Sequence, residues 1–304
     1  MKLSNAWPLQ VFAVNEVVDP VLAFVPCHNR CSITMAFLES LQQCWPGTMP
    51  LVIHVLDDGS SDGTADAVRS RWPGIYLHQL DGRQFWGGAL NAIQSLLANP
   101  VALGLDAEAD PWVLVINDDI QFWSGSLEWA LGLLPYFDVL APAIEGGWGR
   151  VAFDPTNGRF LEFPEPGVSN LATTMATFVR RSTWLQAEPV PKGIPHYLSD
   201  YWFTHSLSCK GFRVTTDRKY RVIIRKDTTR PSGPLAPGWR ARRAYWRSCL
   251  DPRSPDYIPA VITFRRRFST EPHKFWSLAV LQAKMHLYRL LTGYRPGPLA
   301  LLQA

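Results

Sequence analysis

The stretch from Leu51 to Thr64 reads LVIHVLDDGSSDGT and shows how this chain is built. Its apolar beginning, Leu51–Leu56, predicts a buried strand. The strand ends at two adjacent carboxylates and a glycine, and Ser61–Thr64 is expected to open a helix that runs to about Arg71. A strand, a polar loop and a helix in this order form the repeating unit of an α/β fold.

The same unit recurs along the first half of the chain. Further strands are predicted at 21–25, 75–80 and 112–116, and further helices at 31–44 and 87–99. Strands that alternate with helices build a mostly parallel sheet covered on both faces, so we expect a three-layer α/β/α sandwich. Ligands bind such sheets outside the carboxyl ends of the strands. Polar clusters follow the strands at Pro26, Asp57 and Asn117, and we expect these remote stretches to converge on one rim.

Composition and charge narrow the class of protein. The chain has 304 residues, of which 47% are apolar and 18% charged, so it can form a substantial core. Residues 1–150 hold 6 Lys and Arg against 16 Asp and Glu, whereas residues 151–304 hold 24 against 10. The acidic front half suits a cation site. The basic back half suits phosphates, an anionic membrane surface or simply a solvated face.

Cysteine usage and apolar runs indicate a cytoplasmic protein. The five cysteines are an odd number and include no C-x-x-C pair, which argues against a disulfide framework or a structural zinc site. No long apolar segment follows the first residues, so no signal peptide is expected. No run of about 18 apolar residues occurs, so no spanning helix is expected.

Two acidic clusters could support cation or base binding. Asn117-Asp118-Asp119 follows a predicted buried strand, and adjacent carboxylates repel each other unless a cation or water intervenes. A divalent Mg²⁺ or Mn²⁺ held there would neutralise a pyrophosphate, although the triplet also suits a turn or a helix cap. A carboxylate of Asp57-Asp58 could accept the imide N–H of uracil or thymine. A calcium loop is the other interpretation of that string, but the required later glutamate is missing.

Three further clusters carry polar or glycine-rich chemistry. His28, in Pro26-Cys27-His28-Asn29, could stack on a base or bond a phosphate, or lie in an ordinary surface loop. Trp86-Gly87-Gly88 would let a backbone approach closely at a helix N-terminus, or form a simple turn. Asp200, in an aromatic setting before a helix, could be a base with a raised pKa or a helix N-cap. Dinucleotide G-x-G-x-x-G and P-loop motifs are missing.

Taken together in this order, the clusters resemble family 2 glycosyltransferases with the GT-A fold. The resemblance runs from about Val21 to Val214, and the string Asp57–Thr64 is its most typical element. Trp86–Asn91 and His196–Tyr201 are similar to elements of a rhamnosyltransferase-like bacterial subgroup. The resemblance implies an inverting enzyme that transfers a sugar from a nucleoside diphosphate carrier, UDP or dTDP, to an acceptor hydroxyl.

The resemblance also implies a role for each matching residue. Asp200 would be the catalytic base. Asp119 would be the main ligand of Mg²⁺ or Mn²⁺, with Asp118 next to the metal or the ribose. Asp58 would bind the nucleobase, with Asp57 beside it. The other residues of the nucleotide site would be Pro26, His28, Asn29, Trp86, Gly87, Gly88 and Asn91.

Two positions depart from the family's pattern. Asn117 stands at the first acidic position of the usual D-x-D, a change that many relatives share. Trp202 stands where an acidic residue is common, two places after the base, which leaves acceptor recognition open.

The expected domain organisation follows these motifs. Residues 1–225 would form the GT-A domain, with a nucleotide-binding half at 20–120 and an acceptor half at 121–225. A strand and a short helix are expected in 171–186, a helix in 201–210, a strand in 212–214 and a helix in 272–292. Residues 226–304 would form a helical extension.

Partners follow from the same interpretation. The expected ligands are a nucleotide-sugar donor and a glycan or lipid-linked acceptor, with no nucleic acid, in bacterial surface polysaccharide or glycolipid synthesis. Basic residues of the extension would contact a membrane surface at its inner face or a lipid-pyrophosphate acceptor: Arg240, Arg242, Arg243 and Arg265–Arg267.

Two rival functions remain open. A sugar-1-phosphate nucleotidyltransferase has a similar sheet but normally begins with a glycine-rich strand–loop and a basic residue, which this chain lacks. A catalytically inactive glycan- or nucleotide-binding protein on the same fold would account for Asn117 and Trp202. Donor hydrolysis separates these cases.

Overall fold

The computed structural model describes residues 19–146, 150–225 and 239–271, together with positions 280, 283, 287 and 291. The predicted alternation of strands and helices in the first half is confirmed. Its elements are β1 (Val21–Cys27), α1 (Cys31–Cys44), β2 (Leu51–Asp57), α2 (Thr64–Arg71), β3 (Tyr76–Gln79), α3 (Phe85–Leu97), η1 (Pro100–Leu103), β4 (Trp112–Ile116), β5 (Ile120–Phe122), α4 (Ser126–Leu133) and η2 (Leu134–Tyr136).

The second half contributes more strands and further helices. Its elements are β6 (Val139–Ile144), β7 (Arg150–Asp154), β8 (Arg159–Phe163), β9 (Gly167–Ser169), β10 (Ala176–Arg180), α5 (Arg181–Trp184), α6 (Ser199–Ser208), β11 (Val214–Ile224), α7 (Trp239–Leu250) and α8 (Ile258–Phe268). The strand and short helix expected in 171–186 are confirmed as β10 and α5. Helix α6 begins two residues earlier than predicted, and β11 is a much longer strand than predicted. The helix expected over 272–292 lies outside the described residues, apart from the four single positions.

Nine strands form one sheet, in the order β3-β2-β1-β4-β10-β6-β11-β5, with β9 paired to β11. Strands β1 to β4 are parallel, whereas β10 runs antiparallel between β4 and β6. Cys27 pairs with Asp57, and Ala176 pairs with Ile116. The ends of β1, β2 and β4 therefore share one edge of the sheet with the start of β10. Strands β7 and β8 form a separate hairpin.

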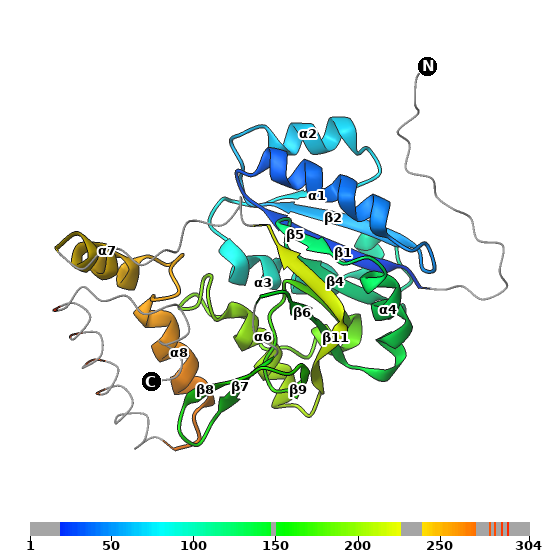
Figure 1. Cartoon of the computed structure of the whole chain (residues 1–304). Coiled ribbons are helices and arrows are strands. Elements are labelled where there is room, and N and C mark those ends of the chain that lie inside the picture. The colour runs from blue at the N-terminus through cyan, green and yellow to red at the C-terminus, as the bar shows by residue number, and fades with distance from the viewer. Residues whose placement is uncertain are drawn as a thin grey trace.

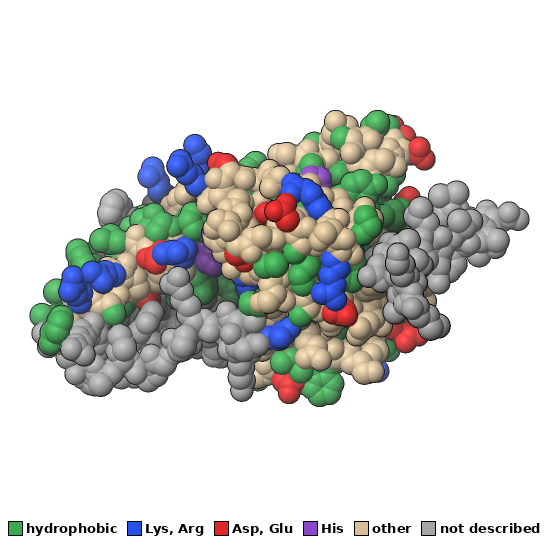
Figure 2. Space-filling view, turned by 90° about the horizontal axis from the view of Figure 1, so that it is seen from above, with side chains coloured by type: hydrophobic (Ala, Val, Ile, Leu, Met, Phe, Trp, Pro, Cys, Tyr) green, Lys and Arg blue, Asp and Glu red, His purple; other side chains and the backbone are tan. Residues whose placement is uncertain are grey.

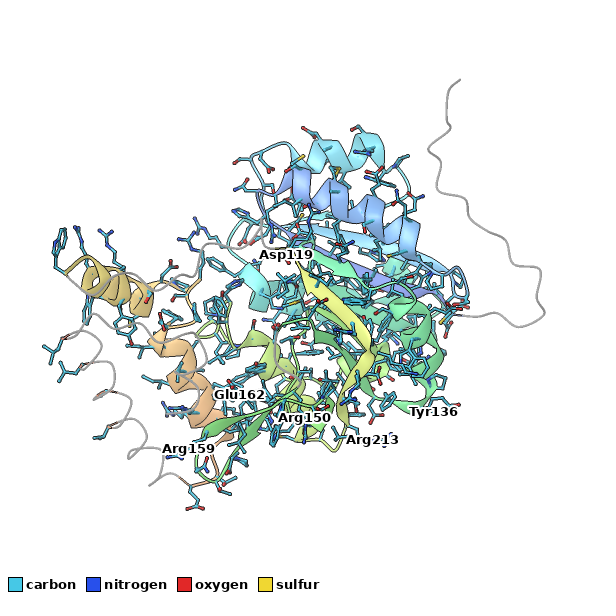
Figure 3. The ribbon with its side chains drawn as sticks, in the orientation of Figure 1. Asp119, Tyr136, Arg150, Arg159, Glu162 and Arg213 are labelled. Carbon is cyan, nitrogen blue, oxygen red and sulfur yellow. The ribbon has the colours of Figure 1, made fainter. Side chains whose placement is uncertain are left out.

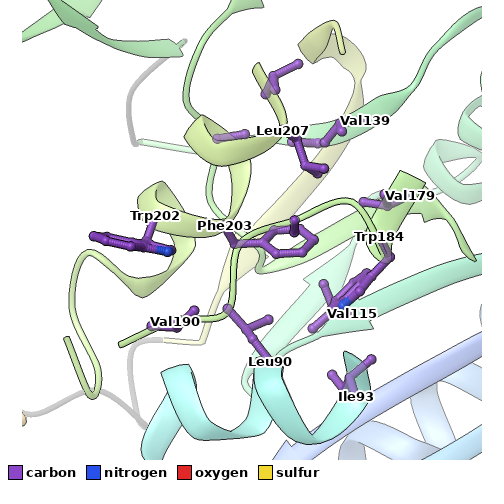
Figure 4. Packing of buried hydrophobic residues seen from close by; sticks show 14 of the residues in the cluster. Leu90, Ile93, Val115, Val139, Val179, Trp184, Val190, Trp202, Phe203 and Leu207 are labelled. Atoms are coloured by element: carbon purple, nitrogen blue, oxygen red, sulfur yellow. The ribbon is translucent and has the colours of Figure 1, made fainter. Parts of the chain in front are cut away.

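Helices cover both faces of this sheet, as the sequence predicts (Figure 1). Side chains of α1, α2 and α4 pack on one face, and side chains of α3, α5, α6 and α8 pack on the other. Leu22 and Phe24 of β1 point to the α3 side, whereas Val21, Ala23 and Val25 point to the α1 side. Both faces are buried, which explains why the strands are continuous apolar runs. Figure 4 shows the α3 side of the core.

Helix α8 packs on α6 through aromatic rings. Phe264 is fully buried, and Phe268 lies 4.8 Å from Trp202 and 4.6 Å from His205, ring centre to ring centre. Trp202 is 6% exposed. This residue therefore anchors α8 to α6, which gives a structural reason for an aromatic side chain at this position. Among the described residues, no helix has both the length and the apolar character needed to cross a membrane.

Candidate functional site

The predicted polar clusters meet at the carboxyl end of the parallel strands. Figure 3 shows Asp119 at this end of the molecule, with Tyr136 and Arg213 at the opposite end. The loops after β1, β2 and β4 begin here because these strands are parallel and in register. The segment before β10 joins them because β10 is antiparallel to β4.

The loops after β1 and β2 are joined by side-chain hydrogen bonds. The Asn29 N–H donates to Ser60 Oγ (2.8 Å), and Asn29 Oδ1 accepts from the Ser61 N–H (2.8 Å). The Cys31 N–H, at the start of α1, donates to Asp62 (2.8 Å). Asp62 also accepts from the Thr64 N–H and therefore binds the first turns of two helices. The typical string after β2 thus serves to hold two loops together.

His28 bridges the same two loops and keeps an exposed ring. Its Nδ1 lies 2.5 Å from the Asp58 carbonyl oxygen, and its Nε2 lies 3.0 Å from Asn29 Nδ2. A carbonyl only accepts and an amide nitrogen only donates, so the network assigns the proton to Nδ1. The ring is exposed beside the partly buried Pro26, where a planar ligand could stack.

Asp58 organises the loop before α3. Its carboxylate is 8% exposed and accepts four hydrogen bonds, from the N–H groups of Gly82, Gln84 and Phe85, with the Gln84 N–H shared by both oxygens. A carboxylate offers about four lone-pair sites, so these donors use its capacity. In the structure the carboxylate holds the loop before α3, and the direct contact of Asp58 with a nucleobase stays a prediction.

A hydrogen-bonded series leads from this loop to Asp200. Phe85 donates to Asp58, and the next residue, Trp86, donates from its indole Nε1 to Thr174 Oγ1 (2.7 Å). The Thr174 hydroxyl in turn donates to the Asp200 carboxylate. Burial raises the pKa of Asp200 to about 6, although the bonds from Thr174 and Trp86 act to lower it. This series of hydrogen bonds therefore links Asp200, the predicted base, to the loop that is predicted to bind the nucleotide.

Gly87 fixes the N-terminus of α3 against the loop before α6. Its N–H donates to the Pro195 carbonyl (2.8 Å), and a Cβ at this position would lie 2.7 Å from the Ile194 carbonyl oxygen. A Cβ on Gly88 would lie 2.5 Å from Gln84 Oε1. Gly87 thus serves a close approach of two backbone segments, whereas Gly88 makes room for the Gln84 side chain.

Asn91 has a structural role in this chain. Its Nδ2 donates to the Val190 carbonyl and its Oδ1 accepts from the Val190 N–H, both at 2.8 Å. This amide therefore joins α3 to the segment before α6. Both ends of the Asn91 amide bind the backbone, and its expected contact with the nucleotide stays a prediction.

The acidic pair binds an arginine that sequence analysis did not identify. Arg30 Nη1 lies 3.1 Å from Asp118 Oδ1, and Arg30 Nη2 lies 2.9 Å from Asp119 Oδ2. Thr34 Oγ1 donates to Asp118 Oδ2 (2.7 Å). Burial raises the pKa of Asp118 to about 6, and Arg30 and Thr34 act against that rise. The cation that two adjacent carboxylates require is here a guanidinium.

The backbone connects the acidic pair to Asp200. The Asn117 N–H, one residue before the pair, donates to the Met175 carbonyl (2.8 Å). Met175 follows Thr174, whose hydroxyl binds Asp200. Hydrogen bonds at one edge of the sheet therefore link the loops after β1 and β2 to the acidic pair after β4 and to Asp200 at the start of α6.

Unusual backbone conformations concentrate around this site. Among the described residues, positive φ occurs at three residues other than glycine: Asn29 (51°), Phe85 (51°) and Leu198 (69°). Asn29 precedes Arg30, Phe85 binds Asp58, and Leu198 lies two residues before Asp200. Such conformations persist where the surrounding structure holds them, and they cluster at functional sites.

The oxygen atoms of the acidic pair and of its neighbours are the kind of ligand that a hard divalent cation prefers. Asp57 Oδ2 and Asn117 Oδ1 are buried and have no hydrogen-bond partner in the part of the chain that the structure describes. Burial raises the pKa of the Cys27 thiol, and Asp118 and Asp57 raise it further, so these carboxylates share one neighbourhood.

A metal ion at the acidic pair would still need further ligands from a bound substrate. No group of three or more His, Cys, Asp or Glu side chains that could hold a metal is found within the described ranges. Mg²⁺ commonly binds one or two carboxylates and completes its shell with phosphates and water. The two carboxylates carry more negative charge than one arginine neutralises, and they do not form a complete set of metal ligands. Both features match that mode of binding.

Sequence reasoning missed three residues of this site, namely Arg30, Thr34 and Thr174. Arg30 directly follows the polar cluster after β1, so its position beside that cluster was a usable signal. Thr34 lies one helical turn further along, on the same side of α1. Thr174 precedes β10 in a segment without a polar motif, and only the fold brings it to Asp200.

Comparison with known proteins adds a partial relative and a fold. No family model matches the chain. Over 105 residues it is 30% identical to N-acetylglucosaminyl-diphospho-decaprenol L-rhamnosyltransferase of Mycobacterium tuberculosis, in two strains. The match covers 34% of this chain and 34% of each relative, so the chain spans about a third of the length of these curated relatives.

The structure is similar to that of GalNAc-T7 with UDP, GalNAc and Mn²⁺. The TM-score is 0.54 at 12% sequence identity, and the similarity covers 80% of this chain and 50% of that chain. The chain has the GT-A fold of glycosyltransferases. The predicted fold class is thereby confirmed.

Proposed function

We propose that this protein is an inverting glycosyltransferase that moves a sugar from a UDP or dTDP carrier to an acceptor hydroxyl. The observation that carries the proposal is the series of hydrogen bonds from the Asp58 loop through Trp86 and Thr174 to Asp200. The GT-A fold and the partial likeness to a rhamnosyltransferase support the same class of reaction. A product for bacterial surface polysaccharide or glycolipid fits that relative's name.

Asp200 would act as the base in a single displacement. The acceptor oxygen attacks the anomeric carbon, its proton passes to Asp200, and the bond from that carbon to the diphosphate oxygen breaks with inversion. With a pKa of about 6, Asp200 is ionised at neutral pH yet is a better base than an ordinary aspartate. The Thr174 hydroxyl orients the carboxylate by binding one of its oxygens.

The donor would bind along the opposite part of the rim. The exposed His28 ring and Pro26 are the candidates for nucleobase contact, and the loop that Asp58 holds before α3 adjoins them. Asp119 and Asp118 are the residues that would hold Mg²⁺ or Mn²⁺. When bound, the metal would neutralise charge on the departing diphosphate. In this proposal, residues 20–120 serve the donor and residues 121–225 serve the acceptor.

A membrane-facing surface would serve a lipid-linked acceptor. The exposed face of α7 carries Trp239, Arg243, Trp246, Arg247 and Leu250, while Tyr245 and Cys249 are buried. Hydrophobic and basic side chains lie side by side at the α7 end of the molecule, on the left of Figure 2. A helix face of tryptophan, leucine and arginine suits the interface of an anionic bilayer.

This surface corrects part of the earlier expectation for basic residues. Arg265 is buried (4% exposed), and Arg267 forms an ion pair with Glu188. The side chains of Arg240 and Arg242 lie outside the described residues. Arg243 and Arg266 remain exposed, and Arg247 joins them.

Flotation with vesicles tests the membrane contact. We expect binding to phosphatidylglycerol-containing vesicles at low salt, and a several-fold loss in the double variant Trp246→Ala/Arg247→Gln, because both anchoring groups are removed. Tyr136→Ala, which alters an exposed aromatic residue at another surface, is the matched control. Equal binding of both variants would contradict this role of α7.

Release of nucleoside diphosphate tests the transferase function. Each of a panel of UDP- and dTDP-sugars is incubated with the protein, with and without Mn²⁺, and free UDP or dTDP is measured. We expect slow, metal-dependent release from at least one donor and its loss in Asp119→Ala. Binding of a donor without any release, under all these conditions, would favour the inactive binding protein instead.

A further inference from the structure

Arg30 occupies both carboxylates that a metal would need. Its guanidinium contacts Asp118 at 3.1 Å and Asp119 at 2.9 Å, and these carboxylates are 2% and 10% exposed. The Arg30 side chain itself is 29% exposed, so it reaches the pair from the solvent side. An arginine and a divalent cation that bind the same oxygens compete, because each satisfies the same negative charge.

The loop that carries Arg30 is built to present this side chain. Asn29 is held at a φ of 51° by bonds to Ser60 and Ser61, across 31 and 32 residues of chain. Such a held conformation fixes where the next residue begins. Arg30 is therefore aimed at the acidic pair by the junction of the loops after β1 and β2, which is the proposed nucleotide side.

The guanidinium also has chemistry for a second ligand. Arginine carries five N–H donors, and the contacts of Arg30 with the acidic pair use only its Nη1 and Nη2 groups. A guanidinium binds phosphate oxygens in the same bidentate manner in which it binds carboxylates. A diphosphate that arrives with its own metal would supply both a new anion for Arg30 and a new cation for the two carboxylates.

We propose that Arg30 is a resident counter-cation that exchanges its partners when the donor binds. In the donor-free protein it neutralises Asp118 and Asp119 and competes with a free divalent cation. When metal and nucleoside diphosphate bind together, the metal takes the carboxylates and Arg30 takes a phosphate oxygen. This inference rests on the proposed function, because it assigns the diphosphate of a nucleotide sugar as the second ligand.

Calorimetric titration of the full chain with MnCl₂ tests the competition. Arg30→Gln should bind Mn²⁺ alone on the order of tenfold more tightly than the wild type, because one competing positive charge is removed. Arg30→Lys keeps the charge but lacks the planar guanidinium, so its affinity for Mn²⁺ should lie between those of the wild type and Arg30→Gln. Arg30→Gln should also melt at a lower temperature, and Mn²⁺ should raise its Tm more than it raises that of the wild type.

A second titration, with UDP or dTDP at saturating Mn²⁺, tests the exchange. Arg30→Gln should bind the nucleoside diphosphate several-fold more weakly, the reverse of its effect on metal alone. Unchanged Mn²⁺ affinity in Arg30→Gln, or unchanged nucleotide affinity, overturns the proposal. If Asp119→Asn abolishes Mn²⁺ binding while Arg30→Gln has no effect, only the Arg30 proposal fails. If neither the wild type nor Arg30→Gln binds Mn²⁺, the metal in the proposed function fails as well.

Discussion

In the proposed function, the loops after β1 and β2 form the donor side of this molecule, and α6 with α8 belongs to the acceptor side; different interactions stabilise these two sides. On the donor side, the loops after β1 and β2 are joined by directional hydrogen bonds such as those of Asn29 and Asp58. On the acceptor side, α8 is attached through aromatic rings, among them Trp202 and Phe264. Hydrogen-bonded loops require particular residues at particular positions, whereas apolar packing accepts many side chains of similar volume.

This difference explains where the sequence carries motifs. The donor side has a recognisable string because each of its polar groups needs a specific partner. The contact between α6 and α8 needs no such string, since any well-packed set of large apolar residues would attach α8. Four predictions can break or sharpen the comparison.

The largest expected effect is on catalysis at the junction of the two sides. Asp200→Asn removes the proposed base and should lower kcat for sugar transfer by about 10²- to 10⁴-fold. UDP or dTDP affinity and Tm should stay near those of the wild type, because the amide keeps the shape and the Thr174 contact. Transfer at the wild-type rate would exclude Asp200 as the base.

The next effect is on the stability of the acceptor side. Phe264→Ala removes a fully buried ring from the α6–α8 contact and should cost about 3–5 kcal/mol in unfolding free energy. Ile262→Ala on the same helix, where the side chain is 47% exposed, is the matched control and should cost much less. Urea unfolding measures both. Equal costs would mean that α8 is not anchored as described.

The contact between the two sides depends on a glycine. Gly87→Ala introduces a Cβ 2.7 Å from the Ile194 carbonyl oxygen and should cost about 1–3 kcal/mol, with weaker activity. Gly132→Ala in α4 is the control, because a Cβ there meets nothing within 4 Å. A Gly87→Ala variant as stable as Gly132→Ala would refute the close approach of α3 to the loop before α6.

The smallest effect concerns the pH dependence of Asp200. Burial raises its pKa to about 6, so activity should rise with pH through this value as the base loses its proton. Thr174→Val removes a hydrogen bond that lowers this pKa, so the acidic limb of the kcat profile should move to higher pH. Thr177→Val, a buried threonine that bonds a backbone carbonyl, is the control. An acidic limb that stays in place would show that the Thr174 bond does not tune Asp200.

Several site residues could be predicted and others could not, for a common reason. Asp118, Asp119 and Asp200 stand at ends of strongly patterned strands or helices, so their convergence follows from the fold class. The direct base contact expected of Asp58 and the nucleotide contact expected of Asn91 depended on which partners those side chains find. In the structure both side chains bind backbone groups, of loop 82–85 and of Val190, and spacing along the chain does not reveal these partners.

The amino-acid sequence by itself determined the layered α/β architecture, because apolar runs alternating with helices bury both faces of a sheet in only one kind of arrangement. It also determined which end of the sheet carries the acidic groups. Only the tertiary structure decided that Arg30 lies between Asp118 and Asp119 and that Thr174 binds Asp200. Those contacts join residues 88, 89 and 26 positions apart along the chain. Contacts across such separations form only when the strands of the sheet have assembled.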